Sequence, residues 1–175
     1  MAVVTEVRFA HEDGALAHTL GELPELDARI VRESSTNPQQ NVYYVRVDYS
    51  DPSRVPGVLE ADHSVADATP MPEFDDRGLI GVEFAADAKL MGPHVTRQGG
   101  LVVDARSAST DQDPRGWHER WLLPDREAIR AVWQRARDEG FTFTLLEFHR
   151  SGRADGTDKG VDVLTGEQRR TLAAA

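Results

Sequence analysis

Apolar and polar residues along the first half of the chain follow a pattern that predicts a βαββαβ order of elements. In the strands the alternation has a period of two: Val45 and Val47 fall on one side, and Arg46 falls on the other. The helices space their leucines four positions apart, as Leu16 and Leu20 show. The expected strands cover residues 3–9, 26–34, 42–49 and 65–71, and the expected helices cover residues 15–23 and a segment that starts at Asp51.

The second half of the chain repeats this order of elements. Its expected strands cover residues 79–84, 101–106, 117–123 and 141–149. A weak helix over residues 89–97 is interrupted by Gly92-Pro93, and a stronger helix is capped by Asp125 and closed by Gly140.

Corresponding positions in the two halves indicate an internal repeat. The helix caps Asp51 and Asp125 lie 125 − 51 = 74 residues apart. One residue further, at an offset of 84 − 9 = 75, Phe9 falls on Phe84. These matches concern positions that face the core, as expected if both halves share a fold.

The repeat predicts an α+β fold with two tandem ferredoxin-like βαββαβ units, over residues 1–75 and 76–150. Residues 151–163 are rich in Gly and charged residues, which is typical of a linker. Residues 164–175 then begin a helix with Thr165 as its cap. We expect this helix to be the first helix of a domain that the chain does not complete.

Composition points to the habitat of the protein. The 175 residues carry 30 Asp+Glu against 20 Lys+Arg, which is a formal net charge of −10. Only Lys89 and Lys159 are lysines, so 20 − 2 = 18 of the cations are arginines. Carboxylates hold water and hydrated cations, whereas long lysine stems add apolar surface that salting-out conditions disfavour. We expect a salt-rich cytoplasm; the alternative is an acidic bacterial protein from a GC-rich genome.

Composition also excludes several classes of protein. The absence of Cys excludes disulfides, thiol catalysis and Cys-ligated zinc. No apolar run approaches the roughly 20 residues that a membrane span needs. The negative charge disfavours a nucleic-acid binder that works through a broad basic patch. We therefore expect a cytoplasmic protein with no membrane partner.

The last twelve residues carry the most specific motif in the chain: Leu-Thr, two polar residues, Gln-Arg, and then Leu and a pair of small residues. This motif resembles the opening of the helix-turn-helix domain of the haloarchaeal bacterio-opsin-activator family. The matching positions are Leu164, Thr165, Gln168, Arg169, Leu172, Ala174 and Ala175, while Gly166 departs from the pattern. The preceding part is similar to the family as well, through the stretch Leu123-Pro124-Asp125-Arg126-Glu127-Ala128 and through Gly140-Phe141.

The resemblance implies a DNA-binding transcription regulator. In that family a later helix enters the major groove, and the chain ends before any such helix. We therefore expect mainly the regulatory and dimerisation domain of the regulator, whose DNA contacts come from a helix-turn-helix that starts at Leu164. A homodimer and a small-molecule effector are the expected partners besides DNA.

Catalytic and metal-binding motifs are not found in the sequence. None of the six histidines has a His-x-His or His-Glu-x-x-His spacing. Two clusters could hold a metal, although surface positions are the simpler interpretation. One is His118 and His149, on separate strands, with Glu119 or Glu147; the other is His11-Glu12-Asp13 with His18. We expect no catalytic residue, no metal and no cofactor.

The exposed side of the strands is the expected ligand or partner surface, by analogy with other paired ferredoxin-like units. The residues expected on this side are Tyr44, Arg46, Asp48, His118, Arg120 and Leu122. Two alternative functions remain at this point. One is a small ferredoxin-like enzyme or ligand-binding dimer that uses a buried histidine, and the other is a dimerisation adaptor without a ligand.

Overall fold

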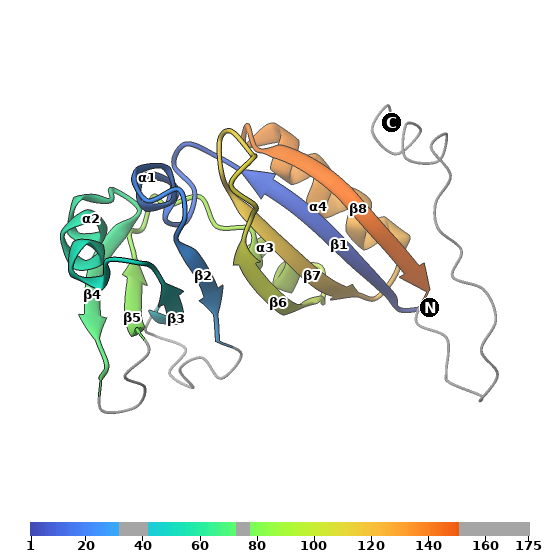
Figure 1. Cartoon of the computed structure of the whole chain (residues 1–175). Helices are drawn as coiled ribbons and strands as arrows, with labels where there is room; N and C mark the ends of the chain where they lie inside the picture. Colours follow the sequence, from blue (N-terminus) through green and yellow to red (C-terminus); the bar gives the residue numbers. More distant parts are fainter. Residues whose placement is uncertain (32–41, 73–77, 151–175) are drawn as a thin grey trace. The chain divides into compact units, whose positions relative to one another are not determined.

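The computed structural model describes residues 1–31, 42–72 and 78–150, and within them the fold is mixed α/β (Figure 1). The strands are β1 (Val3–Ala10), β2 (Asp27–Ile30), β3 (Val42–Asp48), β4 (Val65–Pro70), β5 (Leu79–Phe84), β6 (Leu101–Ser107), β7 (Trp117–Leu123) and β8 (Thr142–Arg150). The helices are α1 (Ala17–Glu22), the 3₁₀ helix η1 (Pro52–Arg54), α2 (Val55–Ala61), α3 (Gly92–Arg97) and α4 (Arg126–Asp138). The expected linker and the expected start of the helix-turn-helix lie outside the described residues.

The order of elements within the described ranges confirms the prediction from the sequence pattern. Helix α4 begins where Asp125 caps it, since the Asp125 side chain accepts a hydrogen bond of 2.9 Å from the backbone N–H of Ala128. The same helix is followed by Gly140, whose φ of 84° lies in the left-handed region that favours glycine.

The weak helix expected over residues 89–97 is shorter in the structure, and α3 begins at Gly92. The expectation that Gly92-Pro93 interrupts the helix is wrong. Proline has no backbone N–H to donate and its φ suits a first turn, so Pro93 lies in the first turn of α3 and does not interrupt it.

The chain forms two compact units, each drawn from separate stretches of sequence. Among the described residues, unit 1 contains Met1–Phe9, Met91–Val103 and residues 119–150, and unit 2 contains those of Ala10–Leu90 and Asp104–His118. The strands are hydrogen-bonded in the order β4-β5-β3-β2-β6-β7-β1-β8. Strands β4, β5, β3 and β2 lie in unit 2, whereas β8 and nearly all of β1 lie in unit 1.

The observed strand order differs from the order expected of two tandem ferredoxin-like units, because two strands have exchanged places. A ferredoxin-like βαββαβ unit places its first strand between its fourth and third strands. In unit 2 that central position is taken by β5, which pairs antiparallel with both β4 and β3. The corresponding position between β8 and β7 is taken by β1, as Figure 1 shows. The expected arrangement of two continuous units in tandem is therefore not confirmed.

Unit 1 is built around an aromatic core. The side chain of Trp121 is fully buried, and its ring centroid lies 6.2 Å from that of Phe9 and 5.9 Å from that of Phe143. Phe141 contacts Phe9 edge to face at 5.9 Å. Helix α4 buries one face through Ala128, Ile129, Val132 and Ala136.

Unit 2 has an aliphatic core beneath two short helices that contact each other, α1 and α2. The leucines predicted from the periodicity are buried here, namely Leu16, Leu20, Leu23 and Leu59. From the sheet, Ala28 and Val45 point into the same core. The opposite side of these strands is left to solvent, because successive side chains of a strand alternate between its two faces.

Candidate functional site

The exposed face of the unit 2 sheet carries the first half of the predicted ligand surface. On β3, Val45 and Val47 are buried, Arg46 and Asp48 are exposed, and Tyr44 is half-buried. The alternation therefore places Tyr44, Arg46 and Asp48 on one side of the strand, away from the core.

The strand register brings three arginines into one line across this face. Arg46 on β3 lies directly opposite Arg29 on β2, and Arg29 lies directly opposite Arg106 on β6. Residues directly opposite each other in an antiparallel pair project from the same face, with Cβ atoms about 5 Å apart. All three side chains are exposed, and all three belong to unit 2. We call Arg29, Arg46 and Arg106 the arginine row.

A carboxylate lies two positions along the strand from each arginine of the row, namely Asp27 from Arg29, Asp48 from Arg46 and Asp104 from Arg106. Arg29 forms an ion pair with Asp104 at 3.3 Å, and the two side chains are 55% and 37% exposed, which makes this a weak surface pair. Asp27 accepts a hydrogen bond of 3.4 Å from Ser107 Oγ and interacts electrostatically with Arg115. Each arginine of the row therefore has a carboxylate near it on the same face of the sheet.

Tyr44 extends this face beside the arginine row. Tyr44 lies opposite Gly81 on β5, and a Cβ added at Gly81 would lie 3.7 Å from the Tyr44 ring and 3.5 Å from Met71 Sδ. These are ordinary van der Waals contacts, so the gap between the Tyr44 ring and Met71 is no larger than a methyl group.

The second half of the predicted surface lies on β7 and is divided between the units. His118 is half-buried in unit 2, whereas Arg120 and Leu122 belong to unit 1. Arg120 Nε donates a hydrogen bond of 2.9 Å to Glu6 Oε1 on β1, so a carboxylate already compensates its charge. The structure thus assigns the six predicted residues to both units, and the DNA-binding positions from Leu164 onward lie outside the described residues.

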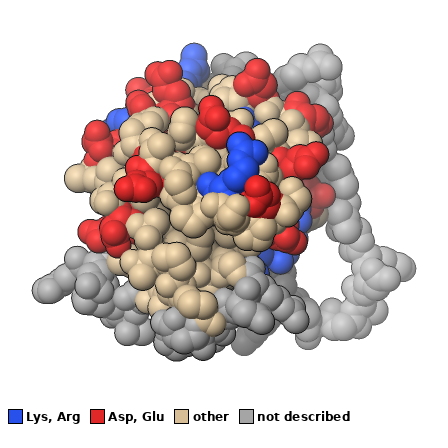
Figure 2. Space-filling view, turned by 60° about the vertical axis from the view of Figure 1, so that its left-hand side comes forward, with Lys and Arg blue, Asp and Glu red and all other residues tan. Residues whose placement is uncertain are grey.

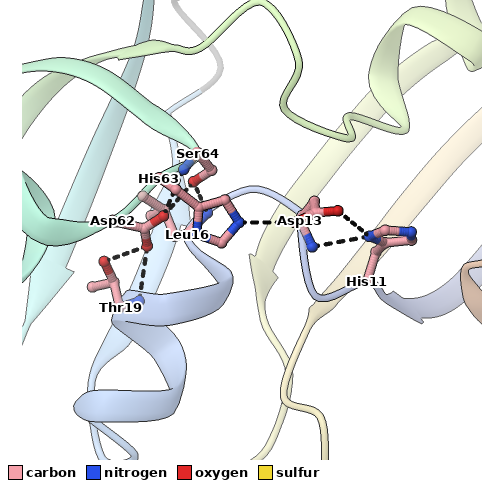
Figure 3. Close-up of polar contacts among 7 residues, drawn as sticks. All are labelled: His11, Asp13, Leu16, Thr19, Asp62, His63 and Ser64. Carbon is pink, nitrogen blue, oxygen red and sulfur yellow. Dashed lines mark hydrogen bonds and ion pairs between the residues drawn. The ribbon is translucent and has the colours of Figure 1, made fainter.

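A buried polar network in unit 2 was missed by the sequence analysis (Figure 3). The Asp62 carboxylate, 1% exposed, accepts hydrogen bonds from Thr19 N at 2.8 Å and from Thr19 Oγ1 at 2.7 Å. Its other oxygen accepts from Ser64 N at 3.0 Å and from Ser64 Oγ at 2.7 Å. Ser64 Oγ in turn accepts from Leu16 N at 2.9 Å.

This network holds the start of α1. The residue before the helix, Leu16, has φ of 55°, which is a left-handed conformation that costs a leucine energy. No side chain of α1 itself caps the helix, so Ser64 and Asp62 satisfy the backbone N–H groups at its start. The Asp-x-Ser spacing of Asp62 and Ser64, directly after α2, is the only sequence feature that indicates this capping role.

Asp13 lies between two histidines at the edge of this network, as Figure 3 shows. His63 Nε2 is 3.0 Å from Asp13 Oδ1, and His11 Nδ1 accepts a hydrogen bond of 2.9 Å from Asp13 N. His63, and not the expected His18, is thus the second histidine at Asp13. Among the residues that the structure describes, no group of three His, Asp or Glu side chains is placed to hold a metal ion.

The other histidine pair considered from the sequence is separated by a strand. His118 lies on β7 and His149 lies on β8, and β1 runs between these two strands. His149 instead pairs with Glu147 on its own strand at 3.0 Å. The expectation that His118 and His149 could become neighbours is therefore wrong, because the third and fourth strands of a ferredoxin-like unit always have another strand between them.

Unit 1 contains a charged cluster where α3 and α4 meet. His94 Nε2 lies 3.1 Å from Glu139 Oε2, and Arg135 Nε lies 2.7 Å from Glu139 Oε1. Arg97 Nη1 donates to His94 Nδ1 at 3.3 Å, which leaves the proton of a neutral His94 on Nε2. Burial raises the pKa of the Glu139 carboxyl, but the hydrogen bonds and charges of His94 and Arg135 outweigh it and hold the pKa below its ordinary value.

Besides Asp62 in unit 2, the acid Glu119 is buried in the aromatic core of unit 1. Glu119 is 6% exposed, and its Oε2 accepts a hydrogen bond of 2.6 Å from Trp121 Nε1. The alternation along β7 places Glu119 on the same, buried side of the strand as Trp121.

Acidic side chains spread widely over the face drawn in Figure 2, with fewer basic side chains among them. None of the helices in the described ranges is long and apolar enough to cross a membrane.

The described residues form a mixed α/β fold with buried polar networks, and no group among them is placed to hold a metal ion. The most distinctive surface of this fold is the arginine row. Residues 3–162 match the family described as BAT, the GAF and HTH_10 associated domain. The match covers most of the chain, and the chain belongs to this family, which is the N-terminal regulatory domain of bacterio-opsin activator-type regulators. Neither the curated proteins nor the solved structures yield a match.

Proposed function

We propose that this domain regulates a DNA-binding transcription factor of a haloarchaeon. The observation that carries the proposal is the family match over residues 3–162, which spans both compact units. The motif from Leu164 to Leu172 adds to it, because it resembles the start of the helix-turn-helix that the family's description names. DNA contact is therefore assigned to the helix-turn-helix, and the domain described here has no catalytic role in the proposal.

The haloarchaeal origin in the proposal is supported by composition. A net charge of −10 and 18 arginines among 20 cations suit a cytoplasm in which molar salt screens the repulsion between carboxylates. In such salt an electrostatic footprint on DNA is largely screened as well, so the acidic surface does not conflict with a regulator.

The proposed mechanism is a change in the geometry of a homodimer. A ligand or partner that binds one arrangement more tightly than another shifts the population towards it, and so changes how two helix-turn-helix heads engage half-sites. The surface proposed for this ligand or partner is taken for each unit by itself, with Tyr44, Arg46, Asp48 and His118 in unit 2 and Arg120 and Leu122 in unit 1. We also propose that each unit has a ferredoxin-like fold. The strand order within each unit supports this fold once the exchange of β1 and β5 is taken into account.

Promoter occupancy in the native host tests the proposed function. The tagged protein is immunoprecipitated with cross-linked DNA, and transcripts are compared between the parent strain and a strain that lacks the gene. We expect enrichment at promoters whose transcripts change on deletion. Enrichment nowhere in the genome, together with an unchanged set of transcripts, would overturn the proposal.

A further inference from the structure

One side of α4 is turned away from α3 and lies along β8 (Figure 1). The cluster at His94 occupies the side of α4 that faces α3. On the other side Arg126 lies over the ring of Phe148 on β8, 5.0 Å from its centroid. Trp133 follows seven residues on and Arg137 four further, so both lie on this side too, where Arg137 stacks over the half-buried Trp133 ring at 5.5 Å. We call this side of α4, together with β8, the α4–β8 flank.

Strand β8 offers a long edge in unit 1. In the part of the chain that the structure describes, its one strand neighbour is β1. A strand with one neighbour presents backbone N–H and C=O groups on its other side, and these groups can pair with a second chain. Strand β4 of unit 2 also has one neighbour, but its ladder shifts register between Val65 and Asp67 and it ends in Pro70. Strand β8 has nine residues and contains no Pro or Lys, the residues that natural sheets place on an edge to prevent pairing.

Helix α4 runs along β8 in the opposite direction. Arg126 at the start of α4 contacts Phe148 near the end of β8. At the other end of the helix the carbonyl of Ala136 accepts a hydrogen bond of 2.9 Å from the backbone N–H of Phe141, the residue before β8. Val132, the midpoint of α4, is therefore level with the middle part of β8. A single two-fold axis at this level would relate both elements to a second copy of themselves, each pair antiparallel.

The charges at the two ends of α4 suit such an antiparallel pair. The helix begins with Arg126-Glu127 and ends with Arg137-Asp138. When two copies pair antiparallel about Val132, Arg126 is level with Asp138 of the second copy, and Glu127 is level with Arg137 of the second copy. Both matches bring opposite charges together, whereas a parallel pair would place each of these residues level with its own kind.

We propose that the α4–β8 flank is a homodimer interface, in which the β8 strands of two copies pair antiparallel and the two α4 helices lie side by side across the same two-fold axis. Trp133 lies one residue from the midpoint of α4, and tryptophan is among the residues that contribute most at the centre of interfaces. All residues of this interface belong to unit 1. The proposal rests on the proposed function for the role of the dimer, and it names the surface that forms it.

Sedimentation equilibrium of the full chain measures the dimer Kd, at the lowest salt in which the chain is folded, since salt screens the charge pairs. We expect a reversible equilibrium between monomer and dimer. A chain that stays monomeric up to its highest soluble concentration would overturn the proposal.

A charge exchange on α4 locates the interface. Glu127→Arg places a cation level with Arg137 of the second copy and is expected to raise the dimer Kd about tenfold. Adding Arg137→Glu restores the opposite charges and should return Kd towards the wild-type value. Glu60→Arg, at an exposed position of α2 in unit 2, is the matched control and should leave Kd unchanged. An equal rise in the control, or no recovery in the double variant, would overturn the proposal.

Cross-linking tests the antiparallel direction, because the chain contains no Cys and a single introduced thiol reports one position. In the proposed dimer the two copies of position 126 lie roughly 18 Å apart along the helix axes, whereas position 126 of one copy is level with position 138 of the other. With a short bismaleimide, a mixture of Arg126→Cys and Asp138→Cys should therefore cross-link more than either variant alone. Stronger cross-linking within one variant than in the mixture would overturn the proposal.

These experiments can fail independently of the proposed function. A dimer through the α4–β8 flank, in a protein that occupies no promoter, would retain the interface and reject the regulator. Promoter occupancy by a protein that is monomeric, or that dimerises without this flank, would do the reverse.

Discussion

Unit 1 packs a long helix against an aromatic core, whereas unit 2 holds two short helices in place with buried hydrogen bonds. The capped helix α4 has 13 residues, but α1 has six and begins at a leucine with positive φ. A helix as short as α1 is not stable alone, so its geometry depends on tertiary contacts. The comparison teaches that both units bury an apolar core, but that the start of a short helix in unit 2 depends on hydrogen bonds from another element, whereas α4 in unit 1 is capped by its own neighbour.

The largest effect is expected for the centre of the aromatic core. Trp121→Ala removes a fully buried indole, its contacts with Phe9 and Phe143, and the donor to Glu119. The free energy of unfolding should fall by about 3–5 kcal/mol, as measured by denaturant titration. Trp133→Ala, on the half-buried side of α4, is the control and should cost clearly less. Equal losses would show that unit 1 does not depend on Trp121 in particular.

A loss of about 3 kcal/mol is expected for Asp62→Ala in unit 2. The substitution leaves the buried N–H of Thr19 and that of Ser64 without an acceptor. Amide hydrogen exchange should accelerate at α1 much more than at α4. Asp51→Ala removes an exposed cap that accepts from Ser53 N, and should cost only about 0.5–1 kcal/mol. Uniform acceleration across both units would contradict the local role of Asp62.

A smaller loss of stability is expected for Arg115, whose side chain also provides hydrogen bonds to backbone groups in unit 2. Its guanidinium donates to the carbonyls of Ala108, Leu23 and Leu26, and burial lowers its pKa, which the charge of Asp27 partly offsets. Arg115→Lys keeps the charge but cannot reach all of these acceptors, so we expect a loss of about 1–2 kcal/mol in denaturant titration. Arg130→Lys should cost nothing measurable, and a matching value for both would argue against this role.

The smallest effect concerns pH and unit 1. Because the folded state holds the pKa of Glu139 below its ordinary value of 4.5, the unfolded chain takes up this proton first as the pH falls. The stabilisation is therefore complete above pH 4.5 and is lost as the pH falls through the lowered pKa. In Glu139→Gln the unfolding free energy should depend less steeply on pH below 4.5, as denaturant titrations at a series of pH values will measure. Parallel curves for wild type and variant would refute this linkage.

Sequence reasoning predicted the elements well where local chemistry defines them. The alternation in β7 and the cap at Asp125 depend on neighbouring residues only, and both are observed. It failed at α3, where the proline was read as a break and not as a start.

The candidate site was predictable only in part. Alternation on β3 was enough to place Tyr44, Arg46 and Asp48 on one face. The arginine row needed the register between three strands, which no local pattern specifies. The network at Asp62 joins residues 43 positions apart, so the sequence offered no means of pairing Thr19 with Asp62.

The sequence by itself determined the order of strands and helices, the faces that are buried, the acidic composition and the family resemblance. Only the tertiary structure decided which strand completes which unit. Phe9 of β1 and Phe84 of β5 hold equivalent, buried positions in the repeat, so each strand presents a suitable apolar face to either unit. Periodicity encodes which side of a strand is buried but not its partner, and the exchange of β1 and β5 is therefore a property of the fold alone.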